Sequence, residues 1–248
     1  MTNFVFVDGA DGIGKTTLCE KLHQSADYVN SNPYASLPLV KAYHERVPSG
    51  TGALHFLRET LKDSSFRCDE FARQLMHSCD NIKTYITVAN TMHLADIASK
   101  SNETRYVFFD RGPMSNIVYS YATFRKAYSD NEQIYEYAKI ISDINLNVID
   151  ELIWSKEVSN VYYVVLLKSK PFRKESDGSY YEEAVKFESV NGQYMVQSKI
   201  MASKYNEFND LHNQVKCIEI NLDALDGEGI SDSEAVAKHV WSRIIGRD

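Results

Sequence analysis

The 248-residue chain is long enough to bury one sizeable core and too short to require a second full domain, so we expect a single domain over residues 1–248. Hydrophobic residues at 44% and charged residues at 25% are ordinary for a globular protein and exclude an intrinsically disordered chain. The formal net charge of -7 makes nucleic acid an unfavourable partner for the protein as a whole.

The four cysteines lie far apart and form no Cys-x-x-Cys pair, which is typical of a reducing compartment and gives no metal-ligand spacing. The chain begins with an apolar segment that lacks the basic region of a signal peptide. No apolar run is long enough to cross a bilayer. We therefore expect a cytoplasmic protein without a membrane partner, either cellular or from a virus acting in the cytoplasm of its host.

Apolar runs that alternate with helical periodicity define the predicted fold. The runs are rich in β-branched and aromatic residues, without strict alternation, which favours parallel strands covered on both faces. The predicted strands cover residues 4–7, 38–43 (the weakest candidate), 106–109, 161–167 and 217–220. The predicted helical stretches cover residues 66–99, 115–154 and 195–212. We predict a three-layer α/β fold with a five-stranded parallel sheet and helices on both faces.

A phosphate-binding motif follows the first predicted strand. Residues 9–16 read Gly-Ala-Asp-Gly-Ile-Gly-Lys-Thr and match G-x-x-x-x-G-K-[ST] at every fixed position. Loop N–H groups and the following helix N-terminus would bind phosphates, Lys15 would reach the β- and γ-phosphates, and the Thr16 hydroxyl would ligate Mg²⁺. The candidate loop residues are Gly9, Asp11, Gly12, Ile13, Gly14, Lys15, Thr16 and Thr17. The motif predicts a P-loop NTPase fold that uses ATP and Mg²⁺, and leaves the class of NTPase open.

Two further segments are candidates for the same site. Asp110 and Arg111 follow the strand at 106–109, at the sheet edge where ligands bind in open α/β folds. Asp110 could hold a water of the Mg²⁺ shell, and Arg111 could bind a phosphate through two N–H groups. Residues 168–193 form a polar, basic stretch after a predicted strand. This stretch fits either a solvated loop or a mobile lid over the phosphates.

In combination these motifs resemble the thymidylate kinase family. The phosphate loop resembles that family's version, with an acid where Asp11 stands. Residues 46–51, Arg-Val-Pro-Ser-Gly-Thr, resemble its Arg-Glu-Pro-Gly-Gly-Thr segment, and Arg58 falls on an arginine of its next helix. Residues 110–119 resemble its Asp-Arg-Tyr-x-x-Ser-x-x-Ala-Tyr stretch. The resemblance implies transfer of the ATP γ-phosphate to dTMP or a related dNMP, modified ones included, by a homodimeric enzyme.

The resemblance also implies roles for single residues. Arg58 and Arg111 would clamp the acceptor phosphate, with Arg46 nearby. Asp11 would bond the sugar 3′-hydroxyl. Tyr119, supported by Ser115, would lie under the deoxyribose. Because Gly12 stands where one subgroup has an arginine, the lid would supply the catalytic cation; Arg173 is preferred over Lys170 and Lys174 since its fork can span two oxygens. Lys15, Asp110, Arg111 and Arg173 are thus the catalytic candidates.

The predicted base pocket departs from the family. Counting back from Asp110, Asn90 stands at the position of the base-binding arginine and Ile86 at that of the stacking phenylalanine. An asparagine can donate and accept, so it could pair with the amide edge of a changed base. The alternative is that Asn90 is an ordinary helix-surface residue and the register is shifted.

Two other classes of P-loop protein are alternatives to a nucleoside monophosphate kinase. A deoxynucleoside or 5-hydroxymethyl-pyrimidine kinase would phosphorylate a hydroxyl, with Glu45 as its base. Such enzymes usually carry Glu-Arg-Ser where this chain has Asp-Arg-Gly at residues 110–112. A GTPase switch would carry Asn-Lys-x-Asp, which the sequence lacks.

Overall fold

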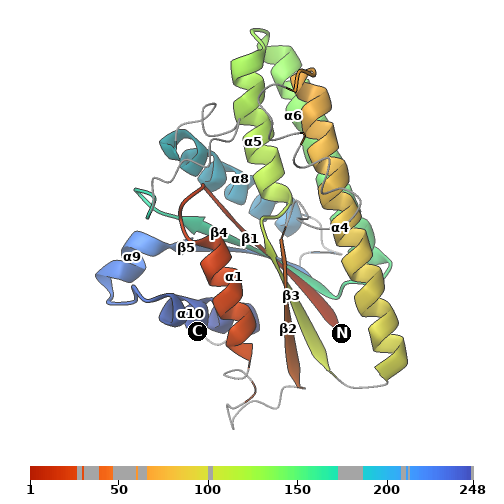
Figure 1. The fold of residues 1–248 in the computed structure, drawn as a ribbon, viewed down its shortest axis with the longest axis vertical. Helices are drawn as coiled ribbons and strands as arrows, with labels where there is room; N and C mark the ends of the chain where they lie inside the picture. Colours follow the sequence, from red (N-terminus) through yellow and green to blue (C-terminus); the bar gives the residue numbers. More distant parts are fainter. Residues whose placement is uncertain are drawn as a thin grey trace.

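The computed structural model describes residues 1–26, 30, 39–46, 60, 66–99, 103–172, 187–207, 211 and 213–246. Five strands form one sheet in the order β2-β3-β1-β4-β5, and every pairing is parallel. Their bounds are Thr2–Gly9 (β1), Val40–Arg46 (β2), Thr104–Asp110 (β3), Asn160–Leu167 (β4) and Val215–Asn221 (β5). This confirms the predicted five-stranded parallel sheet (Figure 1).

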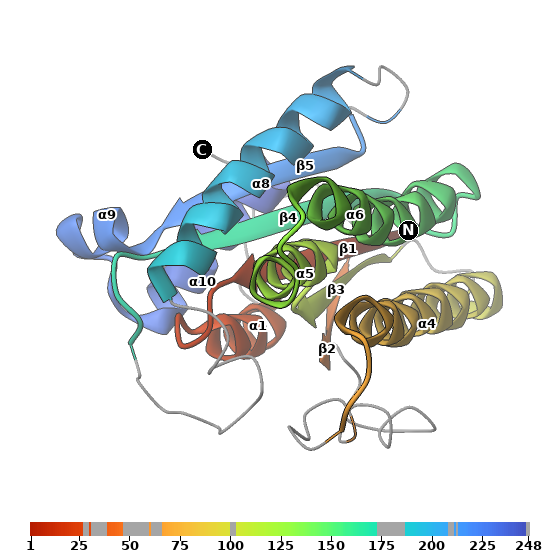
Figure 2. The same cartoon turned by 90° about the horizontal axis from the view of Figure 1, so that it is seen from above.

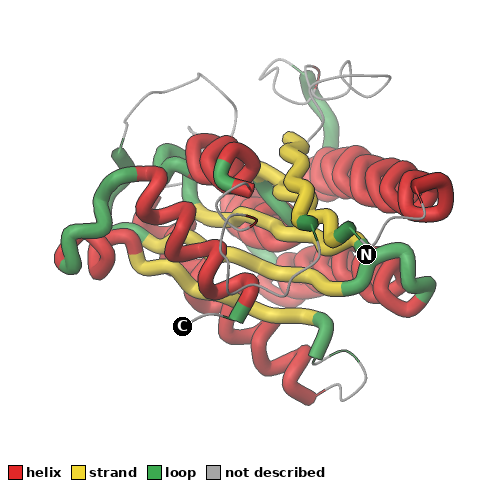
Figure 3. The backbone as a smooth tube through the Cα atoms, turned by 90° about the horizontal axis from the view of Figure 1, so that it is seen from below, coloured by secondary structure: helices red, strands yellow, loops and turns green. Residues whose placement is uncertain are grey.

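Helices cover both faces of this sheet (Figures 2 and 3). They are α1 (Lys15–Gln24), α4 (Glu70–Ser99), α5 (Pro113–Ala127), α6 (Asn131–Trp154), α8 (Phe187–Glu207), α9 (Leu222–Gly227) and α10 (Ser233–Ile245). None of these helices is long and apolar enough to cross a membrane.

The central strand β1 explains why two cores form. All eight of its residues are buried. Phe4 and Phe6 face a core shared with α4, α5, α6 and α8, whereas Val5 and Val7 face a second core shared with α1, α9 and α10. Because successive side chains of a strand point to opposite faces, a continuous apolar run supplies both cores at once.

Two helical predictions differ from the structure in extent. The stretch at 115–154 is two helices, since the chain leaves the helical conformation at residues 128–130 and Asp130 caps α6 by accepting from the Glu132 N–H at 2.9 Å. The helix predicted at 195–212 begins earlier, at Phe187, so residues 187–193 of the predicted lid belong to α8. The lid's residues 173–186 lie outside the described residues.

Candidate active site

The phosphate loop joins β1 to α1 at the C-terminal edge of the sheet. Gly9 and Gly14 adopt φ of +147° and +89°, a region that residues with a side chain rarely occupy. A Cβ on Gly9 would also lie 2.7 Å from the Leu166 carbonyl oxygen. Gly14 is the N-cap of α1, and its carbonyl oxygen accepts a hydrogen bond from the Leu18 N–H. The loop therefore presents a helix N-terminus, which favours an anion.

Lys15 lies beneath this loop and is almost fully buried. Its Nζ donates to the Ala10 carbonyl at 2.8 Å and lies 3.4 Å from Asp11 Oδ1. Burial lowers the pKa of Lys15, the nearby charge of Arg111 lowers it further, and Asp11 and Asp110 oppose both effects. The ammonium group is thus held inside the loop, close to where a phosphate would lie.

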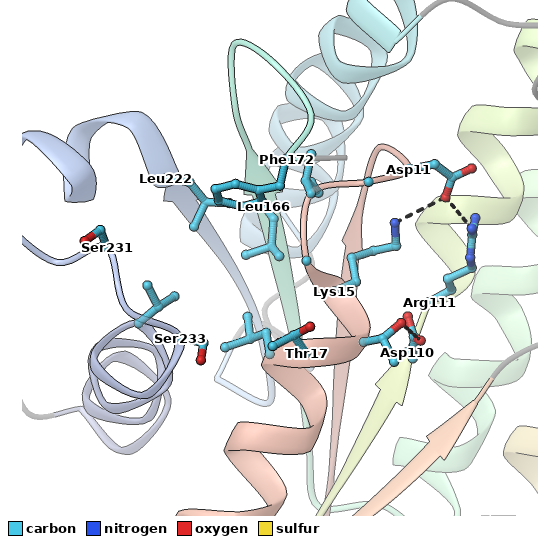
Figure 4. Close-up of a pocket in the computed structure, with 16 residues that line it drawn as sticks. Asp11, Lys15, Thr17, Asp110, Arg111, Leu166, Phe172, Leu222, Ser231 and Ser233 are labelled. Atoms are coloured by element: carbon cyan, nitrogen blue, oxygen red, sulfur yellow. Dashed lines mark hydrogen bonds and ion pairs between the residues drawn. The ribbon is translucent and has the colours of Figure 1, made fainter. Parts of the chain in front are cut away.

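Arg111 extends the positive charge beyond the loop. The register pairs Val7 with Asp110, so β1 and β3 end side by side and Arg111 follows directly. Arg111 donates to Asp11 Oδ1 in an ion pair, and Tyr119 donates its hydroxyl to Asp11 Oδ2 at 2.8 Å. The guanidinium also lies over the Tyr119 ring, 5.6 Å from its centroid. Figure 4 shows Asp11 between Lys15 and Arg111.

The charges around Asp11 determine the protonation state of its carboxyl group. Burial alone raises the pKa of its carboxyl, but the cations Arg111 and Lys15 outweigh burial and leave the pKa below the ordinary value. The same carboxylate raises the pKa of Arg111 against the opposing effect of burial. Asp11 is therefore ionised at neutral pH and is shared by the two cations Lys15 and Arg111.

Thr16 and Asp110 place two oxygen atoms that could ligate a metal ion side by side next to the loop. Thr16 Oγ1 donates to Asp110 Oδ2 at 2.6 Å. A hydroxyl and a carboxylate are the hard ligands that Mg²⁺ prefers, and Mg²⁺ in nucleotide sites usually takes only one or two carboxylates. Within the part of the chain that the structure describes, no group of three or more histidine, cysteine, aspartate or glutamate side chains could hold a metal. These two residues fit Mg²⁺ that is ligated largely by phosphate.

A cavity of about 450 Å³ runs from the phosphate loop to the N-terminus of α10. The candidate residues Gly12, Ile13, Thr16 and Thr17 line this cavity. It is also lined by residues that the sequence did not single out: Leu166 and Phe172 beside the loop, and Leu222, Ser231, Ser233 and Val236. Apolar walls with two hydroxyl groups suit a flat heterocycle attached to the phosphates.

The chain leaving β4 is fastened to this cavity. The Phe172 N–H donates to the Gly12 carbonyl at 2.9 Å. Lys168 Nζ lies 4.3 Å from the centroid of the Phe172 ring and donates to Asp223 and Asp226 at 3.2 and 2.9 Å. These contacts hold the Phe172 ring beside the loop, where it lines the cavity although it is 57% exposed.

Several predicted residues remain untested by this geometry. Arg58 and Arg173 lie outside the described residues, as does Lys174. Arg46 ends β2 and pairs with Asp110 in the register, which places its backbone at the same sheet edge. Lys170 is exposed. Ser115 bonds through its N–H and hydroxyl to Asp8, not to the Tyr119 ring.

The predicted base contacts are not brought to this cluster. Ile86 is 39% exposed and Asn90 is exposed, whereas the buried side of α4 carries Ser78, Asn81 and Tyr85. Counting back from Asp110 assumes a fixed distance between helix and strand, but α4 ends at Ser99 and β3 starts only at Thr104. A shift of one or two residues turns a helical side chain to another face. Asn90 lies on the exposed side of α4, and its role toward a base stays a prediction.

Sequence reasoning also missed Asp8, a buried acid of the site. It is fully buried directly before Gly9, and its Oδ1 accepts from the Gly112 and Ser115 N–H groups at 2.9 and 3.0 Å. The available signal was an acid inside an otherwise apolar strand. Buried carboxylates need partners, so such a position indicates a structural or functional demand.

Gly112 is held at the closest approach between this acid and α5. A Cβ there would lie 2.5 Å from Phe6 Cβ and 2.7 Å from Asp8 Oδ2. We expect Gly112→Ala to lower the free energy of unfolding by about 3 kcal/mol, the upper range for overpacking a core. Urea unfolding would measure the change.

Gly192 of α8 provides the matched control, because no atom lies within 4 Å of an added Cβ. Gly192→Ala should instead stabilise the protein by roughly 0.5–1 kcal/mol through helix propensity. Equal effects at both glycines would contradict the close approach of Gly112.

Comparison with solved structures agrees with this architecture. Thymidylate kinase from Candida albicans matches with a TM-score of 0.52 and 15% identity, covering 98% of this chain and 91% of that chain. Thymidylate kinase from Ehrlichia chaffeensis matches with a TM-score of 0.54 and 16% identity, covering 98% of both chains. The chain has the fold of the thymidylate kinases. No family model and no curated protein sequence matches it.

The thymidylate kinase fold confirms the predicted architecture over nearly the whole chain. At this level of identity the likeness extends to the fold alone. The chemistry has to be argued from the residues of the site.

Proposed function

We propose that the protein is a deoxynucleoside monophosphate kinase that transfers the γ-phosphate of ATP to dTMP or a related dNMP, modified ones included. The observation that carries this proposal is the placement of Arg111 on Asp11, next to Lys15. A P-loop alone needs one lysine for its own triphosphate. A second cation beside it is what an anionic acceptor requires.

The donor nucleotide fits the cavity. Its phosphates would lie on the loop N–H groups and Lys15, and its base between Phe172 and the apolar residues Leu222 and Val236. Thr16 and Asp110 would hold Mg²⁺, which when bound neutralises phosphate charge. Lys15 would stabilise the charge that develops on the transferred group.

The acceptor would lie on the other side of Lys15. Arg111 would bind its phosphate, Asp11 would accept a bond from a sugar hydroxyl, and Tyr119 would form the wall beneath the sugar. An acceptor phosphate oxygen then forms a bond to the γ-phosphorus as the bond to the β-phosphate oxygen breaks, and ADP leaves. The cations serve to position two anions in line and offset their repulsion. Arg46, Arg58 and the lid residue Arg173 are further candidates for this task.

The direct test is ADP release from ATP and Mg²⁺ with each natural dNMP, the matching nucleosides and 5-substituted dUMP analogues. We expect turnover with one or more dNMPs and none with nucleosides. The order of preference among bases would define the acceptor. The absence of ADP release with every dNMP would overturn the proposal.

A hydroxyl acceptor is the second candidate, and Glu45 is the observation in its favour. Glu45 is half-buried near the end of β2, and burial raises its pKa toward that of a general base. Turnover with nucleosides that is lost in Glu45→Gln would establish this alternative. A dNMP kinase should keep its activity in the same variant.

The donor-base site gives a further prediction. Phe172→Ala should raise the KM for ATP about 10-fold, since stacking on an aromatic ring contributes roughly 1–3 kcal/mol per base. The KM for the dNMP should change little. Trp154, which is 58% exposed on α6, offers a control, and Trp154→Ala should leave both constants unchanged. An unaltered KM for ATP in Phe172→Ala would place the base elsewhere.

We also propose a cytoplasmic homodimer. Exposed apolar side chains on the outer face of α4, Leu94 at 65% and Ile97 at 62%, support an interface there. Light scattering of the purified protein, with Leu94→Glu as the variant, would test the dimer: a monomer in the wild type would exclude it.

A further inference from the structure

Asp8 supplies a helix cap from another element. Its Oδ1 accepts from the N–H groups of Gly112 and Ser115 and from the Ser115 hydroxyl. These groups form the N-terminus of α5, whose own N-cap residue Gly112 has no side chain to offer. A carboxylate at a helix N-terminus satisfies unpaired N–H groups and interacts favourably with the helix dipole. The acid that usually stands at the N-cap is here provided by β1.

The same contacts determine the turn that carries Arg111. Arg111 has a φ of +84°, which is strained for a residue with a side chain. Its N–H donates to the Val7 carbonyl at 3.1 Å, and the next N–H, of Gly112, donates to Asp8. Two consecutive N–H groups are thus fixed by two consecutive residues of β1. A strained turn persists only where such contacts over-determine it.

We propose that Asp8 is a positioning residue that holds the turn at Arg111, so that the guanidinium faces Asp11 and the acceptor phosphate. This inference rests on the proposed function, in which Arg111 binds that phosphate. Ser115 connects the same carboxylate to α8, because Tyr194 donates its hydroxyl to Ser115 Oγ at 2.8 Å. Asp8 itself touches neither substrate; it acts through Gly112 and Ser115.

A double-mutant cycle tests this role in the full-length protein. Asp8→Ala should lower kcat/KM for the dNMP about 10- to 100-fold, while the KM for ATP stays within about threefold. In an Arg111→Ala background the same change should cost no more than about threefold, since residues that act as a unit are not additive. Asp8→Asn, which keeps one acceptor oxygen, should lie between wild type and Asp8→Ala. Additive losses would overturn the inference.

A variant at Asp150 is the control that distinguishes a loss of positioning from a general loss of stability. Asp150 is also a buried acid, on α6, and accepts from Lys204 and Tyr205. Asp150→Ala should lower stability without changing kcat/KM for the dNMP. If Asp8→Ala does not fold, Ser115→Ala removes only one donor to the carboxylate and should show the same selective loss, about 3- to 10-fold.

A crystal structure of Asp8→Ala gives an outcome independent of activity. We expect φ of Arg111 to become negative and the ion pair with Asp11 to be lost. A turn that stays at positive φ with the ion pair intact would overturn the inference. If the wild-type enzyme phosphorylates no dNMP, the proposed function is overturned instead. The φ of Arg111 in the variant's crystal structure would still test whether Asp8 holds the turn.

Discussion

Lys15→Ala should reduce kcat for phosphoryl transfer by about 10²–10³-fold, the loss that follows removal of one preorganised donor to developing charge. The ammonium group is held within the phosphate loop by the Ala10 carbonyl and Asp11, so it needs no rearrangement to meet a γ-phosphate. Steady-state kinetics with ATP and the preferred dNMP would measure the effect.

The fold should survive this change. Lys15 is buried at a cost that lowers its pKa, and Asp11 keeps Arg111 and Tyr119 as partners when the lysine is removed. Urea unfolding should therefore show stability that is unchanged or higher. Lys21→Ala is the matched control: Lys21 lies on the same helix, its Nζ donates to Gln24, and the variant should keep full activity. A kcat within fivefold of wild type for Lys15→Ala would mean that the triphosphate binds elsewhere.

Arg111→Ala should lower kcat/KM for the dNMP by roughly 10²–10³-fold, because truncating one member of a partly buried charged pair costs about 2–5 kcal/mol in binding. The loss should appear mainly in the acceptor's constants, with the KM for ATP nearly unchanged. Measuring both constants at saturating co-substrate would resolve this split. Arg111→Lys should recover only part of the loss, because an ammonium lacks the two-pronged geometry.

Arg125 controls for a general effect of removing charge from this helix. It lies near the C-terminal end of α5, the helix that follows Arg111, with its guanidinium 5.9 Å from the centroid of the Tyr121 ring, and it is exposed. Arg125→Ala should leave kcat/KM unchanged. A loss in Arg111→Ala that falls equally on ATP and the dNMP would indicate that Arg111 serves the donor rather than the acceptor.

Much of this site could be predicted because its signals are local. The phosphate loop is a contiguous motif between a strand and a helix, and Asp110, Arg111 and Tyr119 lie within one strand end and the next helix. The parallel sheet then brings these two segments together, since strand ends meet at one edge. Asp11 contacts both Arg111 and Tyr119 in the structure, and the substrate roles of the three residues stay predictions.

The remaining features of the site depend on three-dimensional geometry that the spacing of residues along the sequence does not determine. Asn90 was placed by counting across a helix, a loop and a strand, and an error of one or two residues in that count turns the side chain to another face of the helix. Asp8 was missed because its partners, Gly112 and Ser115, lie a hundred residues away in sequence. Phe172 was missed because an aromatic residue after a strand carries no signal of its own until the cavity is seen.

The sheet order also bears on how the chain is made. Of the five strands of this sheet β1 is synthesised first, yet its neighbours are β3 and β4, with Phe4 opposite Val107 and Val161. At roughly 5–20 residues per second, its eight buried residues wait on the order of ten seconds or more for the second partner. Such non-local pairing slows folding and leaves an apolar segment open to association with other chains. We therefore expect the nascent chain to depend on chaperones until β4 has emerged, and the yield of soluble protein to improve when synthesis is carried out at lower temperature.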